Sequence, residues 1–236
     1  MVDTLIIKRM GSPHFDSFTT LLHLAFDRAL CLESEVSEEC LKLPGMSGRR
    51  YRMFINNLIR LVSKPRYLEI GSWAGSTACS AMDKNVVKVL CIDNWSQFGG
   101  PRDAFVQNTS AFVTKNVDFS LIESDFRAVD VSKIGPFNVY LYDGPHEQQD
   151  QYDGLFMYGS VLDDDIFFIV DDWNWKPVRD GTINAIRETG FQIDYAVELR
   201  TTLDNTHAAA AGAASDWHNG YFLSKLSRIK RNHSLL

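Results

Sequence analysis

The sequence predicts a doubly wound α/β fold, in which helices cover both faces of a mostly parallel, seven-stranded sheet. From Arg66 onward, short runs rich in Val, Ile, Leu, Phe and Tyr alternate with longer segments that suit helices. This alternation is typical of parallel strands joined by helical crossovers. An acidic residue also lies at or just after the end of the first five runs. The 236 residues, 45% hydrophobic and 23% charged, suit one globular domain.

Five runs are predicted to form the parallel part of the sheet. They are Tyr67–Ile70, Val87–Ile92, Phe119–Ile122, Phe137–Tyr142 and Ile166–Val170. The segments between them are long enough for right-handed crossovers. These segments are Ser76–Met82, Arg102–Lys115, a short connection at Phe126–Ile134, and Glu147–Val161. The acidic run Asp163–Asp165 is expected to be a solvated turn before the fifth strand.

A helix and two further strands are predicted after the fifth parallel strand. The helix Val178–Thr189 ends before Gly190, and the strands are Phe191–Arg200 and Gly220–Ser227. These two strands are expected to pair as an antiparallel edge, so the last strand runs against the others. Between them, the small-residue segment His207–Ser215 is either a mobile loop or a short helix.

Residues 1–65 are predicted to be a helical addition to the domain formed by residues 66–236. Its expected helices are Phe15–Leu32, Ser34–Leu41 and Arg49–Val62, with a break at Leu43–Gly48. No linker or internal repeat separates it from the rest of the sequence, so it is assigned to the same domain. It could cover a ligand site or form a contact between copies of the chain in a homo-oligomer.

The charge balance argues against a nucleic-acid partner. The formal net charge is −6, which gives no global positive field to hold a phosphate backbone. Basic residues gather between Arg49 and Arg66 and between Lys225 and Arg231, where solvated helix faces and a frayed tail are the expected setting. The sequence has no apolar run of membrane-spanning length and no secretory signal. We therefore expect a cytoplasmic protein without a membrane partner.

The four cysteines do not predict a metal or disulfide framework. Cys31, Cys40, Cys79 and Cys91 form no Cys-x-x-Cys pair and have no zinc-like spacing with histidine. Cys79 and Cys91 lie in apolar surroundings and are expected in the core.

The most informative stretch is the glycine turn between the first strand and the following helix, Tyr67–Thr77. Gly71 and Gly75 permit tight backbone geometry, and Ser76 or Thr77 can cap a helix whose first amides face a ligand. Glu69 can accept hydrogen bonds from a cationic amino group. Dinucleotide-binding turns differ, because they use Gly-x-Gly-x-x-Gly. An ordinary strand-to-helix turn is the alternative without a ligand.

Acids at the next two strand ends match what a bound nucleoside requires. Asp93 ends the second strand where ribose hydroxyls would lie. After the third strand, Asp125 offers an acceptor for an adenine amino group, and Phe126 offers an aromatic surface beside it. Each acid taken alone could instead be a helix cap.

Together, Glu69–Gly75, Ile92-Asp93 and Ser124–Phe126 resemble the motifs of class I S-adenosylmethionine-dependent methyltransferases, which have a Rossmann-like fold. The resemblance covers Arg66 to Asn174 by motif and reaches further by the order of elements. It implies that the turn holds the methionine part, Asp93 the ribose, and Asp125 with Phe126 the adenine. Trp73 departs from the family's commonest turn, which has glycine there. The full set of implied cofactor residues is Glu69, Gly71, Ser72, Trp73, Gly75, Ser76, Asp93, Asn94, Asp125, Phe126 and Asp143.

Carboxylates at the fourth and fifth strand ends predict a metal site. Asp143 follows the fourth strand, and Asp171 and Asp172 follow the fifth. Neighbouring parallel strands lie ~5 Å apart, so these side chains should converge. Crowded carboxylates favour Mg²⁺, with Mn²⁺ or Ca²⁺ as substitutes. A bound metal would lower the pKa of a substrate hydroxyl. The alternative is an Asp-Asp pair that caps a turn.

His146 is the candidate base, because it lies three residues after Asp143 and titrates near physiological pH. The Asp143–His146 spacing resembles an Asp-x-x-His loop of sugar-modifying, metal-dependent O-methyltransferases. The remaining histidines show no comparable setting; they are His14, His23, His207, His218 and His233. Tryptophans near the strand ends could line an acceptor pocket or simply pack; they are Trp73, Trp95, Trp173 and Trp175. The loop Trp95–Arg102 is placed over the site.

The sequence therefore predicts a metal-assisted O-methyltransferase that acts on a small hydroxylated molecule, a sugar or a secondary metabolite. Asp143 and His146 are its predicted catalytic residues. Two alternatives remain: an NAD-dependent oxidoreductase, and a protein that binds a nucleoside cofactor without turnover.

Overall fold

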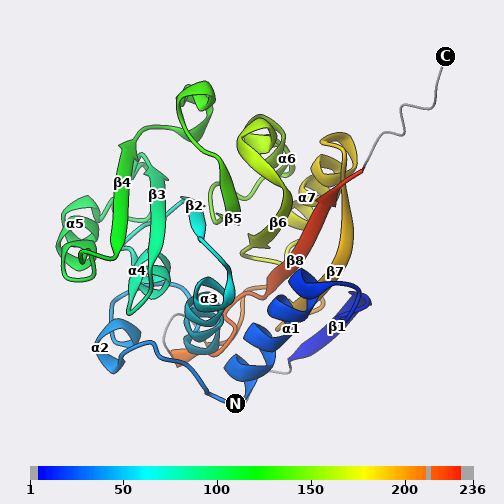
Figure 1. The fold of residues 1–236 in the computed structure, drawn as a ribbon, viewed down its shortest axis with the longest axis horizontal. Coiled ribbons are helices and arrows are strands. Elements are labelled where there is room, and N and C mark those ends of the chain that lie inside the picture. Colours follow the sequence, from blue (N-terminus) through cyan, green and yellow to red (C-terminus); the bar gives the residue numbers. More distant parts are fainter. Residues whose placement is uncertain (1–4, 211–213, 230–236) are drawn as a thin grey trace.

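The computed structural model describes residues 5–210 and 214–229 and contains a central sheet between layers of helices (Figure 1). The strand order is β1-β7-β8-β6-β5-β2-β3-β4. The strands are β1 (Ile6–Gly11), β2 (Arg66–Ile70), β3 (Val87–Asp93), β4 (Val117–Glu123), β5 (Phe137–Tyr142), β6 (Leu162–Val170), β7 (Phe191–Arg200) and β8 (Tyr221–Arg228). The helices are α1 (Ser17–Leu30), α2 (Glu38–Leu41), α3 (Arg49–Leu61), α4 (Ser76–Met82), α5 (Arg102–Ser110), α6 (Gln148–Tyr158) and α7 (Lys176–Glu188).

The pairing confirms the predicted doubly wound fold. Strands β2 to β6 are mutually parallel, in the order β4-β3-β2-β5-β6. The last strand, β8, is antiparallel to both β6 and β7 and lies between them. The carboxyl ends of the five parallel strands therefore share one edge of the sheet, which is where ligands bind in such folds.

Successive side chains of the strands point to opposite faces of the sheet and pack in two separate hydrophobic cores. On one face Tyr67, Val89 and Leu141 pack with α1, α3 and α4. On the other face Leu68 and Tyr140 join a core that α6 and α7 complete. Strands buried on both faces are typical of parallel sheets covered by helices, and they explain the continuous apolar runs of the sequence.

The sheet has eight strands rather than the predicted seven, because β1 adds one to the N-terminal part that was expected to be wholly helical. It pairs antiparallel with β7, from Ile6 opposite Arg200 to Gly11 opposite Tyr195. Consequently β7 and β8 pair as predicted but are not the edge of the sheet. Most side chains of β1 are exposed or half-exposed, so the sequence carries no apolar alternation that would reveal the strand.

The prediction of a solvated turn at Asp163–Asp165 is wrong, because these residues belong to β6. Cations from distant elements compensate their charges. Arg66 pairs with Asp163, Lys225 Nζ lies 2.6 Å from Asp165 Oδ1, and Arg228 Nε lies 3.3 Å from Asp164 Oδ1. Tertiary ion pairs therefore override the low strand propensity of aspartate.

Two basic residues expected in solvent are buried. Lys225 lies within β8 rather than in a frayed tail, is 1% exposed, and also contacts Asp194 at 2.6 Å. Arg52 on α3 is fully buried and donates hydrogen bonds to the carbonyl oxygens of Leu41 (3.2 Å) and Leu43 (2.8 Å). Both cations have internal acceptors, which permits burial.

Several element boundaries differ from the predictions. Helix α5 stops at Ser110, and the short connection after β4 consists of two single-turn 3-10 helices, Phe126–Ala128 and Val131–Lys133. In the small-residue segment, residues 207–210 form no helix, and residues 211–213 lie outside the described part of the chain. The buried Cys79 and Cys91 confirm the expected core positions.

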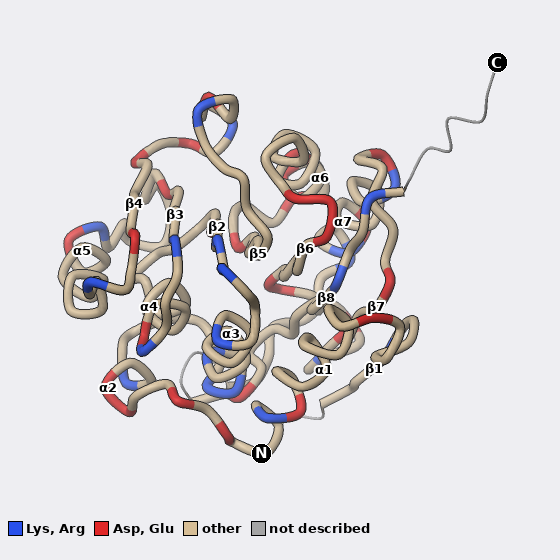
Figure 2. The backbone as a smooth tube through the Cα atoms, in the orientation of Figure 1, with Lys and Arg blue, Asp and Glu red and all other residues tan. Residues whose placement is uncertain are grey.

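Figure 2 shows Lys and Arg residues on several separate elements, with Asp and Glu residues near them. In the ranges 5–210 and 214–229, no helix combines the length and the apolar character that crossing a membrane requires.

Candidate cofactor and metal site

A cavity of about 370 Å³ opens at the carboxyl ends of the parallel strands, within the size range of small-molecule sites. Many predicted site residues line it; they are Gly71, Trp73, Asp93, Asn94, Asp125, Phe126, Asp143, His146, Asp171 and Asp172. The structure thus brings both predicted groups of residues, for cofactor and for metal, into one cavity.

The glycine turn is fixed by close backbone contacts. Gly71 has φ +81°, and a Cβ atom there would lie 1.9 Å from the backbone oxygen of Asp143. Only glycine tolerates this combination of a left-handed backbone and a close approach. The amide of Asp143 also donates to the carbonyl of Ile70, at 2.8 Å. The turn therefore brings the end of β2 directly against Asp143, the predicted metal ligand.

Asp93 holds the glycine turn as well as facing the cavity. Its Oδ2 accepts hydrogen bonds from the amides of Ser72 (2.7 Å) and Trp73 (2.8 Å), and its Oδ1 accepts one from Trp95 (2.7 Å). A carboxylate offers about four acceptor positions, so about one remains for a ligand hydroxyl. Trp73 sits in the turn at φ +45°, a conformation that these bonds support.

The loop after β3 is tied to the turn by indole groups. Trp73 Nε1 donates to the carbonyl of Phe98 at 3.0 Å, and Trp95 Nε1 donates to the carbonyl of Trp73 at 2.9 Å. Trp95, Phe98 and the two residues between them line the cavity. The predicted loop over the site is therefore present.

Asp125 and Phe126, the residues predicted to hold adenine, both lie at the cavity wall. Asp125 faces the cavity, and its Oδ1 also accepts a hydrogen bond from the amide of Arg127 at 2.8 Å. Phe126 is 5% exposed and lies against Tyr142, with ring centroids 5.8 Å apart. Asp125 therefore caps a short helix while remaining available at the cavity wall.

Four predicted cofactor residues lie behind the cavity rather than on its wall: Glu69, Ser72, Gly75 and Ser76. Gly75, with φ +85°, is the N-cap of α4 and no side chain caps that helix, so the prediction of a Ser76 or Thr77 cap is wrong. Ser76 Oγ instead contacts Ser47 Oγ at 2.9 Å. This contact connects the N-terminal part of the chain to the turn.

Glu69 is fully buried beneath the turn. The hydroxyl of Tyr67 donates to its Oε2, while Oε1 has no hydrogen-bond partner among the described residues. Burial raises the pKa of Glu69 from 4.5 to about 7, although hydrogen bonds from neighbouring hydroxyls oppose the shift. A cationic ligand group nearby would favour the charged form.

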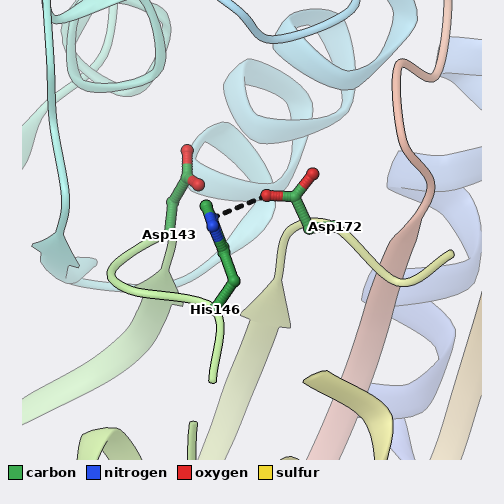
Figure 3. Close-up of side chains that lie close together, drawn as sticks. All are labelled: Asp143, His146 and Asp172. Carbon is green, nitrogen blue, oxygen red and sulfur yellow. Dashed lines mark ion pairs between the residues drawn. The ribbon is translucent and has the colours of Figure 1, made fainter. Parts of the chain in front are cut away.

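The candidate metal cluster consists of Asp143, His146 and Asp172 (Figure 3). One ligand atom from each lies within 4.8 Å of the others. His146, on the loop after β5, lies between the two carboxylates, and its Nε2 is 2.7 Å from Asp172 Oδ2. The two carboxylates are hard oxygen donors of the kind that Mg²⁺ and Mn²⁺ prefer, and the imidazole lies beside them.

Asp171 was predicted as the third ligand, but it lies outside this cluster. Its Oδ1 accepts a hydrogen bond from the amide of Asp172 at 2.6 Å. Asp172 has a left-handed backbone (φ +57°), which turns its carboxylate toward His146. The third member of the cluster is therefore His146, which lies against Asp172, rather than Asp171.

The electrostatics of the cavity call for a cation. Five aspartates and neither lysine nor arginine occur among the residues that line it. Burial and the neighbouring carboxylates of Asp171 and Asp172 raise the pKa of Asp143 well above its usual range. Burial raises that of Asp171 as well. Asp172 differs, because His146 lowers its pKa although burial opposes this.

The wall beyond the metal cluster contains Trp175, which was among the predicted pocket residues, and three residues that the sequence reasoning missed, His207, His218 and Asn219. The ring of Trp175 meets the edges of His146 and His207, with centroids 5.0 and 4.9 Å apart. His218 and Asn219 also line the cavity, so the expectation that His207 and His218 have no comparable setting is wrong. They arrive on the β7–β8 connection, because an antiparallel β8 begins at the edge where the parallel strands end.

Closeness in the sequence does not decide which residues line the cavity, as Trp173 and Met46 show. Trp173 stacks on Phe222 at 4.4 Å and is 1% exposed, so it does not line the cavity. Met46, from the break before α3, does line it. The break therefore contributes to the site.

Comparison with known proteins gives a likeness of fold. No protein-family model matches the chain, and no curated protein matches it by sequence. A precorrin-6y C5,15-methyltransferase from Geobacter metallireducens has a similar structure, with 12% identity and a TM-score of 0.54 over 79% of this chain and 92% of that chain.

Two further solved structures are similar over most of both chains. A candidate RNA methyltransferase from Pyrococcus horikoshii has 13% identity and a TM-score of 0.54, over 86% of this chain and 98% of that one. A candidate O-methyltransferase from Klebsiella pneumoniae has 14% identity and a TM-score of 0.53, over 86% and 90%. The chain thus has the Rossmann-like fold that is found in these methyltransferases.

Proposed function

We propose that this protein is an S-adenosylmethionine-dependent methyltransferase that methylates a hydroxyl oxygen of a small acceptor with the help of a divalent metal. One observation carries the proposal. A single cavity joins the glycine turn, Asp93 and Asp125 to the cluster of Asp143, His146 and Asp172. A nucleoside cofactor on the first group would present its reactive end to the second.

The cofactor assignment is supported by where the acceptors and turns lie. Asp93 retains about one acceptor position for a ribose hydroxyl, and Asp125 with Phe126 offers the acid and the ring for adenine. Gly71 lets the backbone approach a ligand closely. The turn lacks the Gly-x-Gly-x-x-Gly spacing of dinucleotide sites, which disfavours the oxidoreductase.

The residues also suit a divalent metal. Asp143 and Asp172 would supply oxygen ligands at the end of the cavity, with further positions open to substrate oxygens. When bound, the metal lowers the pKa of a coordinated hydroxyl. A bound cation would compensate the carboxylate of Asp143 and so lower its raised pKa.

In the proposed reaction His146 accepts the proton of the substrate hydroxyl. A neutral imidazole that donates from Nε2 to Asp172 Oδ2 leaves Nδ1 as its proton acceptor. The acceptor oxygen then bonds to the methyl carbon, the carbon–sulfur bond breaks, and its electron pair stays on sulfur. The products are a methyl ether, S-adenosylhomocysteine and a proton on His146.

The cavity favours a neutral acceptor over an anionic one. Its wall carries five aspartates without lysine or arginine, and a phosphate backbone would meet like charge there. The carboxylates, Asn219 and the histidines offer hydrogen-bonding partners to hydroxyl groups, and Trp175 offers a ring surface. A sugar or another small hydroxylated metabolite matches this combination.

Calorimetric titration with S-adenosylhomocysteine and with NAD⁺, each with Mg²⁺ or EDTA, tests the cofactor class. We expect binding of S-adenosylhomocysteine alone, and its weakening in Asp125→Asn. Binding of NAD⁺ alone would support the oxidoreductase instead. Binding of neither would contradict the proposal.

Turnover is tested by following S-adenosylhomocysteine release over a panel of hydroxylated acceptors. Asp143→Asn should lower Mg²⁺-dependent turnover by at least 100-fold while cofactor affinity changes little. Asp164→Asn, at the opposite end of the parallel strands, is the matched control and should keep both. Wild-type turnover that is the same in EDTA as in Mg²⁺ would refute the metal's role.

A further inference from the structure

The described parts of the connection between β7 and β8, residues 201–210 and 214–220, form the wall of the cavity that faces the metal cluster. They contribute His207, His218 and Asn219 to the lining. The start of the connection is fastened because Asn174 Oδ1 accepts hydrogen bonds from the amides of Thr201 (2.9 Å) and Thr202 (3.3 Å). The placement of His207, further along the connection, depends on contacts made beyond these two residues.

Asn219 makes one such contact, and it does so with both ends of its side-chain amide. Nδ2 donates to Asp172 Oδ1 at 2.7 Å, and Oδ1 accepts from the amide of Ala208, next to His207, at 2.9 Å. The side chain is well buried, since Asn219 is 3% exposed. Because the amide group is planar and rigid, fixing one of its ends fixes the direction of the other.

Asp172 can transmit a change in the cluster to this amide. Its two carboxylate oxygens face different partners: Oδ2 lies 2.7 Å from His146 Nε2, and Oδ1 accepts from Asn219. Its backbone is in the left-handed region, which is uncommon for residues other than glycine. A cation bound to the carboxylate of Asp172 would therefore also hold the side-chain amide of Asn219, which donates to that carboxylate, in one orientation.

We propose that Asn219 is a positioning residue that couples occupancy of the Asp143–His146–Asp172 cluster to the order of residues 202–210, and so to the placement of His207 beside Trp175. The inference rests on the proposed function for its divalent metal, but not on methyl transfer. It implies that the acceptor wall forms fully when the metal is bound, which would impose an order in which metal precedes acceptor.

Hydrogen–deuterium exchange of the full chain, without and with saturating Mn²⁺, tests the coupling. In the wild type, Mn²⁺ should slow exchange in peptides covering residues 202–210 by at least fivefold. Asn219→Ala should lose this metal-dependent protection and weaken Mn²⁺ binding by about 10-fold or more, the usual effect of removing a partner of a ligand. Asn219→Ser, a milder change, should lose the protection too and serves if the alanine variant does not fold.

Asn205→Gly is the matched control, because Asn205 also fastens this connection but contacts Lys176 and Arg179 rather than Asp172. Glycine accepts its φ of +65°. This variant should exchange faster without metal yet keep Mn²⁺ affinity within twofold and keep the protection by metal. Absence of protection in the wild type, or its retention in both Asn219 variants, would overturn the inference. S-adenosylhomocysteine binding by the same samples judges the proposed function separately.

Discussion

Replacing Asp93 by alanine should destabilise the protein even in the absence of any cofactor. The carboxylate accepts hydrogen bonds from the backbone amides of Ser72, Trp73 and Trp95. Each hydrogen bond to a charged group contributes roughly 1.5–3 kcal/mol. Asp93 is half-buried, so water can replace part of this, and we expect a loss of about 3 kcal/mol in the free energy of unfolding.

Urea denaturation and calorimetry of the apoprotein measure this effect. For a chain of this size, about 3 kcal/mol corresponds to a fall in Tm of roughly 6–12 °C. Asp125→Ala is the control, because its side chain accepts from the single backbone amide of Arg127 near the surface; its loss should stay within about 1 kcal/mol. If Asp93→Ala matched the wild type in stability, Asp93 would not hold the turn and its role would be confined to the ligand.

Three further changes have expected outcomes. Gly71→Ala places a Cβ against the backbone oxygen of Asp143 and should weaken S-adenosylhomocysteine binding at least 10-fold in calorimetry, since the turn must move. Lys225→Met removes the cationic partner of the nearly buried carboxylate of Asp194, which keeps only neutral hydrogen-bond donors, and should lower the free energy of unfolding by about 3 kcal/mol in urea. Glu69→Gln should flatten the dependence of stability on pH: the folded carboxyl keeps its proton up to about pH 7, so wild-type stability falls between pH 4.5 and 7, by about 3 kcal/mol from this group.

Controls and contrary results are available for each of these. Gly99 has the same left-handed backbone (φ +80°), but a Cβ there meets no atom within 4 Å, so Gly99→Ala adds backbone strain without the close approach. It should keep cofactor affinity, and equal losses at both glycines would contradict the close-approach argument. Asp164→Asn removes a mostly exposed partner of Arg228 and should change stability by less than about 1 kcal/mol. A Lys225→Met variant as stable as the wild type would show that Asp194 finds another partner. If the free energy of unfolding depended on pH in the same way in Glu69→Gln and in the wild type, a group other than Glu69 would cause the dependence.

The parallel half of the sheet could be predicted from the sequence because its signals are local. Apolar runs buried on both faces, such as Phe137–Tyr142, are readable from composition alone. The short helix Ser76–Met82 was also located residue for residue. Acids at strand ends follow directly from these boundaries, which explains why Asp93, Asp125 and Asp143 meet in one cavity.

The other half depends on long-range contacts that no local pattern carries. Strand β1 is mostly exposed and exists because β7 lies beside it. The strand position of Asp163–Asp165 requires partners such as Lys225 and Arg228. At the site, spacing put Asp171 among the ligands, yet a left-handed Asp172 and its bond to His146 decided otherwise. The residue type alone does not reveal that the backbone of Asp172 is left-handed, so the direction of its side chain could not be predicted.

The position of β8 between β6 and β7 has a consequence for the order of folding. The strands that carry the nucleoside side of the cavity, β2 to β4, pair residues only 22 to 30 apart in the sequence, although β2 also pairs with β5 across 72 residues. The metal-facing wall requires β8 to insert beside a strand some 60 residues earlier, and β1 pairs with a strand almost 190 residues later. Long loop closures slow folding. The β2–β3–β4 pairings should therefore form before the β8 pairing that completes the acceptor wall, and the pairing of β1 should form last.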